Sequence, residues 1–181
     1  MKTPPPAFTL RPWTMDDLDN LVRFANNKRI ADNLADAFPH PYTPEDGIVF
    51  VHAGNSDGSQ PHAVSQLPGR VFAIVVEEVA CGCIGFYPQA DVHRKNAEIG
   101  YWLAEEYQGR GIMTEAVKQV IRYVFSTYDI CRIFASTFAT NRASQRVLEK
   151  AGMHLEARLH QSICKNGQVL DELIYSVVAA G

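Results

Sequence analysis

The chain has 181 residues, 46% of them apolar and 20% charged, with a formal net charge of −3 and a pI near 6.0. These values are those of one ordinary globular domain, which we expect to span residues 1–181, and they exclude a disordered chain. A slightly acidic chain has no bulk attraction for nucleic acid or for an anionic membrane surface, so neither is expected as a partner.

The sequence also indicates a cellular compartment. No apolar run approaches the length that spans a bilayer, and residues 1–8 hold one lysine and three prolines where a signal peptide would be apolar. The cysteines form no CxxC pair. A metal or redox role for the neighbouring Cys81 and Cys83 stays open, but free thiols are the favoured interpretation. Free thiols without an export signal predict a cytoplasmic protein, and no metal site is expected.

The N-terminal part of the chain predicts one strand and two helices. A strand is expected at residues 8–11, and a capping-box pattern begins a helix at Thr14. Residues 26–42 are rich in turn formers and are expected to be irregular. A second helix is expected from Thr43. Residues 54–69 predict a long polar loop, of a kind that is often functional.

From residue 70 onward the pattern changes to strands that alternate with two helices. β-prone runs and apolar helical stripes are separated by turn formers, and Asn166-Gly167 is typical of a hairpin. The expected elements are strands at 71–76, 83–87, 97–103 and 132–138, helices at 111–128 and 141–152, and two strands that flank the hairpin. This order predicts an α/β domain built on one mixed central sheet.

The most informative stretch joins the strand at 97–103 to the long helix through Gln108-Gly109-Arg110-Gly111. Glycines let successive backbone N–H groups converge without Cβ atoms in the way, and these donors stand at the positive end of a helix. A diphosphate placed there would gain several backbone hydrogen bonds, and Arg110 would add a positive charge. A tight turn without a ligand is the alternative. A dinucleotide fingerprint fits poorly, because Thr114 stands at its third glycine position, and a nucleotide P-loop motif is absent.

A second polar group follows the strand at 132–138. Asn141 and Ser144 stand at the start of the next helix. If the strands at 97–103 and 132–138 are parallel neighbours, their ends meet at one edge of the sheet, where α/β folds place ligands. We expect the Asn141 amide and the Ser144 hydroxyl to face a ligand cleft there. Capping of the helix by the same residues is compatible with this role.

With these motifs in place, the sequence resembles the GNAT-type N-acetyltransferases, in particular the RimJ/RimL-like branch of ribosomal-protein N-terminal acetyltransferases. The resemblance covers nearly the whole chain, and its motifs are specific in combination. They are LRPWTMDD at 10–17, AEIGYWL at 97–103, YQGRGIMTEAV at 107–117, NRASQRVLEKAG at 141–152 and NGQVLDELIYSV at 166–177. The resemblance implies a single acyl-CoA N-acyltransferase domain whose sheet contains two splayed parallel strands.

The resemblance implies that acetyl-CoA, the co-substrate, binds in the cleft between the splayed strands. Its pantetheine arm would pair with the backbone of Trp102 and Leu103, and Asn141 and Ser144 would line its other side. Met113 is larger than the residue usual at its position. The pyrophosphate would lie on the amides of the loop and first helical turn, Gln108, Gly109, Arg110, Gly111, Ile112, Met113 and Thr114.

The implied reaction transfers the acetyl group to a primary amine, which must lose a proton to a base. Glu98 is the candidate base, although a solvated or salt-bridged carboxylate is an equal alternative. The N–H of Leu103 would stabilise the oxyanion, and Ser144 would donate a proton to the departing thiolate. Two family positions differ, because Leu148 replaces a tyrosine acid and Ile163 replaces a glutamate base. The alternative function is therefore a non-catalytic CoA-binding sensor or partner module.

The acceptor is expected to be an amine-bearing small molecule or a peptide or protein N-terminus. An α-amine has a pKa of about 7.7–8.0 against about 10.4 for a lysine side chain, so it needs less help from a base and is favoured. Residues 26–42, the loop at 54–69 and the C-terminal hairpin are expected to form the acceptor side. Trp13, His40 and Tyr42 are candidate contacts there, with plain packing or exposure as the alternative. Related enzymes often pair, so a homodimer is a possible assembly.

Overall fold

The computed structural model of the protein describes residues 5–55 and 70–179. Helix α3 (Pro44–Asn55) continues into the start of the expected 54–69 loop, and the rest of that loop lies outside the described residues. Within the described part of the chain, no helix is long and apolar enough to cross a membrane.

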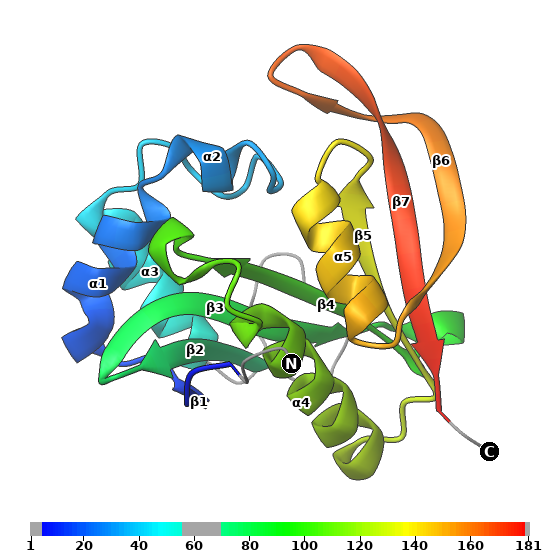
Figure 1. Ribbon diagram of the computed structural model, residues 1–181, viewed down its shortest axis with the longest axis horizontal. Helices are drawn as coiled ribbons and strands as arrows, with labels where there is room; N and C mark the ends of the chain where they lie inside the picture. The colour runs from blue at the N-terminus through cyan, green and yellow to red at the C-terminus, as the bar shows by residue number, and fades with distance from the viewer. Residues whose placement is uncertain (1–4, 56–69, 180–181) are drawn as a thin grey trace.

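A seven-stranded mixed sheet organises the described residues, with helices on both faces (Figure 1). The strand order is β1-β2-β3-β4-β5-β7-β6, and β4–β5 is the single parallel pair in this sheet. The strands are β1 (Thr9–Pro12), β2 (Arg70–Val76), β3 (Val79–Pro88), β4 (Asn96–Leu103), β5 (Arg132–Phe138), β6 (His154–Lys165) and β7 (Gln168–Val178). The expected α/β fold on one mixed central sheet is confirmed.

The helices begin where the sequence places capping residues. The backbone N–H and hydroxyl of Thr14 both donate to Asp17 Oδ2 at 3.0 Å, which forms the expected capping box. Residues 26–42 are less irregular than expected, because Asn27 caps a short helix by accepting from the Arg29 N–H at 2.9 Å. The helices are α1 (Leu18–Ala25), α2 (Lys28–Ala31), α3, α4 (Ile112–Thr127) and α5 (Arg142–Lys150), with 3-10 turns η1 (Met15–Asp17), η2 (Asp91–His93) and η3 (Glu105–Tyr107).

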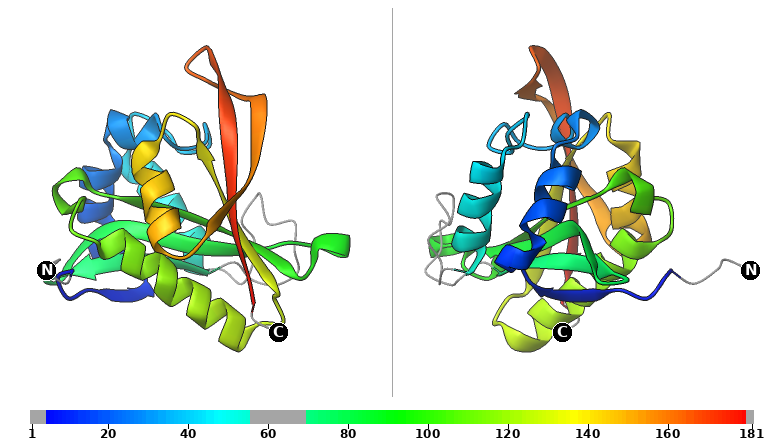
Figure 2. Two further views of the ribbon diagram at one scale, coloured as in Figure 1. Left: turned by 45° about the vertical axis from the view of Figure 1, so that its right-hand side comes forward. Right: turned by 90° about the vertical axis from the view of Figure 1, so that its left-hand side faces the viewer.

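The two faces of β4 look toward different helices, as the alternation of side chains along a strand requires. Trp102 stacks on Trp13 with ring centroids 6.5 Å apart, on the face that α1 and α3 cover. Tyr101 points the other way and contacts Ser144 of α5. Figure 2 shows the same division, with α3 on one side of the sheet and α4 and α5 on the other. Cys81 and Cys83 are buried free thiols in β3.

The parallel pairing of β4 with β5 is short. It covers three residue pairs, Asn96↔Arg132, Ala97↔Ile133 and Glu98↔Phe134. Beyond Glu98 the two strands continue separately, β4 as far as Leu103 and β5 as far as Phe138. The expected splay between two parallel strands is therefore present.

Gly82 of β3 fixes the end of β4 by its lack of a side chain. A Cβ at this position would lie 2.8 Å from the Trp102 carbonyl oxygen and 3.2 Å from the Leu103 Cα. Both are backbone atoms, which cannot move aside like the end of a flexible side chain. We expect Gly82→Ala to destabilise the protein by about 1–3 kcal/mol, as overpacking of a core does, measured by chemical denaturation.

Gly100→Ala provides the matched control on the neighbouring strand. Its added Cβ would meet the Tyr87 side chain at 3.5 Å, which is an ordinary van der Waals contact. Equal losses of stability in the two variants would show that the close approach at Gly82 has no special importance.

Candidate active site

The loop before α4 has the geometry of an anion-binding site. Gly109 and Gly111 have φ values of 74° and 82°, in the left-handed region that favours glycine. An added Cβ at Gly109 would meet no described atom within 4 Å, so the space above the loop is open. The Gln108 N–H already donates to the Glu105 carbonyl at 3.1 Å. The Glu115 N–H donates to the Gly111 carbonyl at 3.1 Å, so the amides of Ile112, Met113 and Thr114 have no acceptor within the helix. These free donors and the open space fit a bound diphosphate.

Side chains in the first turn of α4 point away from this site. Ile112 and Met113 are both buried in the hydrophobic core. The larger side chain of Met113 is therefore accommodated inside the protein, where it leaves the outer surface of the loop clear. Only the main chain of the first turn, with the half-buried Thr114, faces a ligand at this position.

Two polar side chains of the loop have separate roles. The Gln108 Nε2 donates to the Leu103 carbonyl at 2.8 Å and so ties the loop to the end of β4. Arg110 is exposed, and its guanidinium carbon lies 5.6 Å from the centre of the Tyr107 ring. Arg110 is thus held over an aromatic face at the rim of the loop, where its charge is available to a phosphate.

The main chain of Leu103 faces the splay. The Ala104 N–H donates to the Cys81 carbonyl of β3 at 2.8 Å. Because backbone groups of successive residues in a strand point to opposite sides, the N–H of Leu103 points away from β3 and toward the gap. The same alternation directs the backbone of Trp102 to its β3 partner Cys83. Leu103 is therefore the residue of this pair whose main chain a ligand in the gap can reach.

Ser144 borders the gap from α5 and is held at two points. Its N–H donates to the Asn141 Oδ1 at 3.1 Å, so Asn141 caps the helix. The Ser144 Oγ lies 2.8 Å from the phenol oxygen of Tyr101, a hydrogen bond that links α5 to β4. Sequence reasoning missed Tyr101. The signal was its odd-numbered place on β4, which puts its side chain on the face opposite Glu98.

Glu98 lies at the last position of β4 that pairs with β5, on the face that α1 and α3 cover further along the sheet. The Ser136 hydroxyl of β5 donates to Glu98 Oε1 at 3.4 Å. Burial raises the pKa of the Glu98 carboxyl above its ordinary value, the Ser136 hydrogen bond lowers it, and the negative charge of Glu172 raises it. A carboxylate with a raised pKa is a stronger base than a solvated one, which is the property that amine deprotonation requires.

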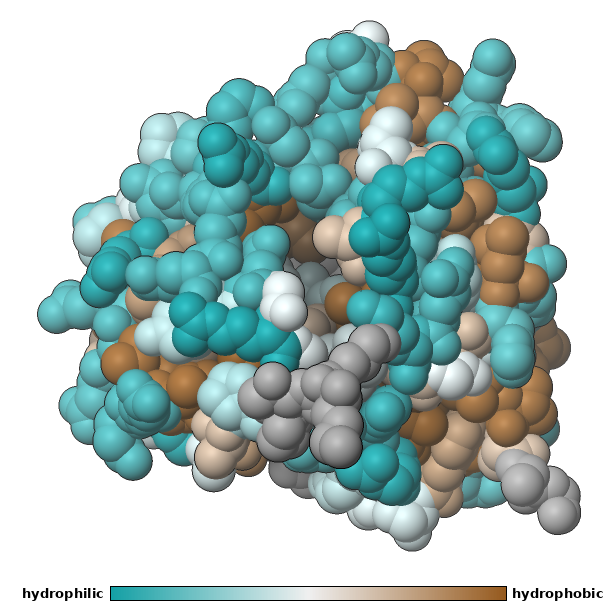
Figure 3. All heavy atoms as spheres, viewed as in Figure 1, coloured by the Kyte–Doolittle hydropathy of each residue, from teal (hydrophilic) through white to brown (hydrophobic). Residues whose placement is uncertain are grey.

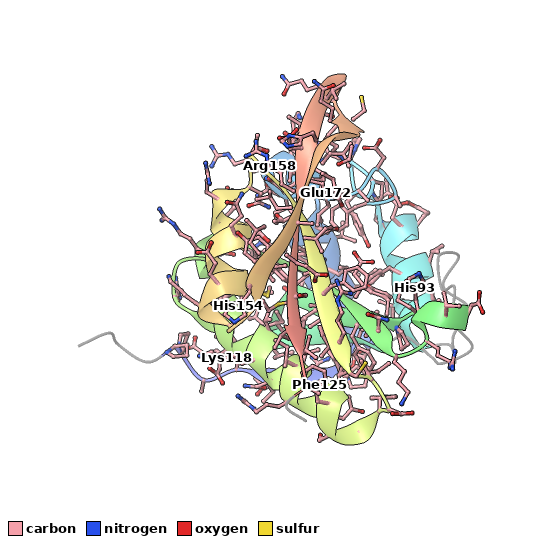
Figure 4. All side chains as sticks on the ribbon, turned by 90° about the vertical axis from the view of Figure 1, so that its right-hand side faces the viewer. His93, Lys118, Phe125, His154, Arg158 and Glu172 are labelled. Carbon is pink, nitrogen blue, oxygen red and sulfur yellow. The ribbon has the colours of Figure 1, made fainter. Side chains whose placement is uncertain are left out.

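Glu172 of β7 is a second carboxylate on this face that sequence reasoning missed. It pairs with Phe138 of β5, which shares a face of the sheet with Ser136 and hence with Glu98. Figure 4 labels Glu172 in the half of β7 that is nearer the hairpin. Among the described residues, Glu172 has no hydrogen-bond or ion-pair partner. Its negative charge raises the pKa of the Glu98 carboxyl.

Removing that charge should change the pH dependence of the reaction. A base works when deprotonated, so activity is lost as the pH falls through its pKa. We expect Glu172→Gln to lower the pKa of Glu98 and to move the acid limb of the kcat/KM profile to lower pH. The control is Glu149→Gln on α5, which removes the same charge on the opposite face, where Glu149 accepts from the Tyr175 hydroxyl. An acid limb that stays in place in Glu172→Gln would contradict the assignment of Glu98 as the titrating base.

Some of the residues expected on the acceptor side are packed in the core, and others line a cavity. Trp13 and Tyr42 are buried, and the ring of Phe38 packs against Tyr42 and Trp102 with centroids 5.3 and 6.1 Å apart. The exposed His40 lines a cavity of about 400 Å³. Residues from the 26–42 segment and the hairpin tip surround this cavity together, namely Lys28, Ala31, Asp32, Asp36, Phe38, Pro39, His40, Lys165 and Asn166.

Polar contacts close the far side of this cavity. The Lys165 Nζ of the hairpin lies 2.7 Å from Asp36 Oδ1, and the Asn166 amide donates to Asp32 Oδ1 at 2.8 Å. Figure 3 shows the molecule hollowed between α2 and α5, with apolar side chains visible inside the hollow. The two segments that were expected to form the acceptor side are thus in direct contact.

The two departures from the family pattern also have a place in the structure. Leu148 of α5 is fully buried, so this position offers a packing side chain and no proton donor. Ile163 is half-buried in β6, next to the register shift between Leu159 and Ile163. Among the described residues there is no group of three or more histidine, cysteine, aspartate or glutamate side chains that could hold a metal ion.

Comparison with known proteins gives the family. A model described as "Acetyltransferase (GNAT) domain" matches residues 7–154. The chain is 40% identical over 97 residues, 54% of each chain, to the uncharacterized N-acetyltransferase YoaA of Bacillus subtilis (strain 168). It is 30% identical over 173 residues to the uncharacterized N-acetyltransferase p20 of Bacillus licheniformis, which covers 94% of this chain and 92% of that protein. The chain spans between 46% and 62% of the length of YoaA and of two further relatives, the putative ribosomal N-acetyltransferase YdaF and the probable N-acetyltransferase YjcK of the same organism.

The fold is also similar to those of solved acetyltransferase structures. The solved structure of RimL, a ribosomal L7/L12 alpha-N-protein acetyltransferase in complex with coenzyme A, superposes with a TM-score of 0.80 at 22% identity. The superposition covers 94% of this chain and 93% of RimL. At this identity the likeness shows the fold, and the family follows from the matched domain. The splayed parallel strands, the glycine loop at the start of α4 and the match over residues 7–154 together place this chain in the GNAT acetyltransferase family.

Proposed function

We propose that the protein transfers the acetyl group of acetyl-CoA to a primary amine. The observation that carries this proposal is the early end of the β4–β5 pairing at Glu98↔Phe134, together with a helix start at Ile112 whose first amides have no acceptor within the helix. The gap offers the main chain of Leu103 to a pantetheine arm, and residues 109–111 and the first turn of α4 offer amides to the pyrophosphate, whereas the Gln108 N–H already donates to the Glu105 carbonyl at 3.1 Å. Gln108 ties the loop to the end of β4, and Arg110 lies at the rim of the loop. Asn141 and Ser144 border the gap from the side of α5.

The proposed chemistry follows from the two faces of β4. The acceptor amine lies on the face of Glu98, which takes its proton as the nitrogen attacks the thioester carbonyl. The Leu103 N–H points into the gap and stabilises the oxyanion of the tetrahedral intermediate. The sulfur leaves on the other face, beside Ser144. The base, Glu98, and the residue beside the leaving sulfur, Ser144, thus lie on opposite faces of β4.

The proposed acceptor binds in the cavity between α2 and the hairpin tip. Phe38 links the cavity to Trp102 at the end of β4, so an amine held there is close to the thioester position. We favour the α-amine of a peptide or protein N-terminus over a lysine side chain, because its lower pKa leaves more of it neutral. The resemblance to an alpha-N-protein acetyltransferase supports this choice. We also propose a cytoplasmic location, which the free thiols support, and assembly as a homodimer.

Release of free coenzyme A thiol, measured over a panel of α-amino peptides, lysyl peptides and small amines, tests the proposed reaction. We expect turnover with at least one amine and a preference for α-amines near neutral pH. Thermal unfolding with acetyl-CoA tests binding alone, because a ligand held only by the native state raises the melting temperature. Stabilisation by acetyl-CoA without turnover of any amine would identify the protein as a non-catalytic coenzyme sensor and overturn the proposal.

A further inference from the structure

One hydrogen bond spans the gap between the splayed strands on the side of α5. The Tyr101 phenol oxygen of β4 lies 2.8 Å from the Ser144 Oγ and 3.5 Å from the Ser144 carbonyl oxygen. Ser144 is also anchored through its N–H to Asn141. Both the main chain and the side chain of Ser144 are therefore held.

Either oxygen of this pair could donate the hydrogen bond. Burial raises the pKa of the Tyr101 phenol above its ordinary value, so the phenol is neutral and carries its hydrogen. With the phenol as the donor, the Ser144 Oγ is the acceptor. A hydroxyl has one hydrogen and two acceptor positions. Once Ser144 accepts from Tyr101, its own hydrogen is left to point elsewhere.

The position of the pair determines what that hydrogen can reach. Tyr101 and Leu103 are two positions apart on β4, so their side chains lie on the same face of the sheet. The main chain of Leu103 faces the gap. The side chain of Glu98 lies on the other face of the sheet, next to Ser136. The Ser144 hydroxyl therefore borders the gap on the side away from the base, where the proposed reaction releases the sulfur.

We propose that Tyr101 is a positioning residue. It does not contact the substrate, but it orients the Ser144 hydroxyl so that the hydroxyl hydrogen points at the sulfur that leaves acetyl-CoA. This inference rests on the proposed acetyl transfer. In the step concerned, the amine nitrogen forms the C–N bond and its proton passes to Glu98. The C–S bond breaks, its electron pair stays on sulfur, and the thiolate is stabilised by the Ser144 hydrogen bond.

Acidity also decides between hydrogen bonding and proton transfer at this step. A coenzyme thiol resembles cysteine, with a pKa of about 8.5, whereas the reference value of a phenol is about 10. Burial raises the pKa of the Tyr101 phenol still further above that of the thiol. Proton transfer from the pair to the thiolate is therefore uphill, and the pair acts by donating a hydrogen bond. The thiolate takes its proton from water after release.

The test compares Tyr101→Phe with acetyl-CoA and with the acetyl selenoester of coenzyme A. A selenolate is a weaker base than a thiolate and leaves without assistance, while the two molecules have nearly the same shape. With acetyl-CoA we expect kcat to fall about tenfold, the effect of losing an oriented hydrogen bond to a charged atom, with little change in KM. With the selenoester the same substitution should have a much smaller effect. The product measured is the acetylated amine, with the amine that the wild-type protein uses fastest.

A double-mutant cycle separates positioning from plain structure. If Tyr101 acts through Ser144, Tyr101→Phe should have no further effect on kcat in a Ser144→Ala background. Tyr175→Phe is the control, because it also removes a tyrosine hydrogen bond to α5, from the Tyr175 hydroxyl to Glu149 Oε1 at 3.1 Å. We expect that control to leave the ratio of thioester to selenoester rates unchanged.

The outcomes are distinguishable from those of the proposed function. A wild-type protein that turns over no amine overturns the proposed function, whatever the variants do. An active wild-type protein with equal losses for thioester and selenoester in Tyr101→Phe, or with additive effects in the cycle, overturns the inference alone.

Discussion

Replacement of Glu98 by glutamine is expected to lower kcat/KM for the amine by about a hundredfold or more, the usual contribution of a general base. Glutamine has the shape of glutamate and keeps an oxygen that can accept from the Ser136 hydroxyl, now 3.4 Å from Glu98 Oε1. The substitution therefore removes the base and leaves the local geometry in place. Steady-state rates of thiol release, measured with the best amine of the panel, check this expectation.

Binding of acetyl-CoA serves as the internal control for Glu98→Gln. Glu98 lies on the face of β4 opposite Tyr101, and the loop at 108–111 lies beyond the far end of the strand. We therefore expect the stabilisation by acetyl-CoA in thermal unfolding to match that of the wild-type protein. A variant that keeps most of its activity across the pH range would show that water or the acceptor itself removes the proton.

Replacement of Gly109 by valine is the second large effect that we expect. Valine at a φ of 74° is strained, and its side chain would project into space that is open above the loop. Displacing two charge-assisted hydrogen bonds of about 1.5 kcal/mol each should weaken acetyl-CoA binding by about a hundredfold. Isothermal titration with coenzyme A measures the dissociation constant directly.

Gly152→Val is a matched control for the strain itself. Gly152 follows α5 with a φ of 93°, and an added Cβ there would also meet no described atom within 4 Å. Both variants should lose comparable stability, but only Gly109→Val should lose coenzyme affinity. Similar dissociation constants in the two variants would mean that the glycine loop does not bind the coenzyme.

The parts of the site that could be predicted from sequence are those built from consecutive residues. A strand, two glycines and a helix start follow one another between residues 97 and 117, so local conformation alone fixes where the amides of Ile112 to Thr114 lie. The cap formed by Asn141 and the hairpin turn at Asn166-Gly167 are local in the same sense. Their neighbours in sequence are also their neighbours in space.

The residues that sequence reasoning missed depend on register between distant segments. Tyr101 is separated from Ser144 by 43 residues, and the contact exists only because α5 crosses over the odd-numbered face of β4. Glu172 comes near Glu98 through two strand pairings, β4 with β5 and β5 with β7. A shift of one residue in either pairing would put these side chains on opposite faces. Periodicity within one strand carries no information about such a shift.

The short parallel pairing also divides the sheet into two units. Strands β1 to β4 and strands β5 to β7 each form a continuous antiparallel unit, and three residue pairs join the units at one seam. A coenzyme that pairs with Leu103 and also borders α5 would span that seam and add to the cohesion of the two units. Coenzyme bound in this way would therefore strengthen the junction between the two halves of the sheet as well as supply the acetyl group.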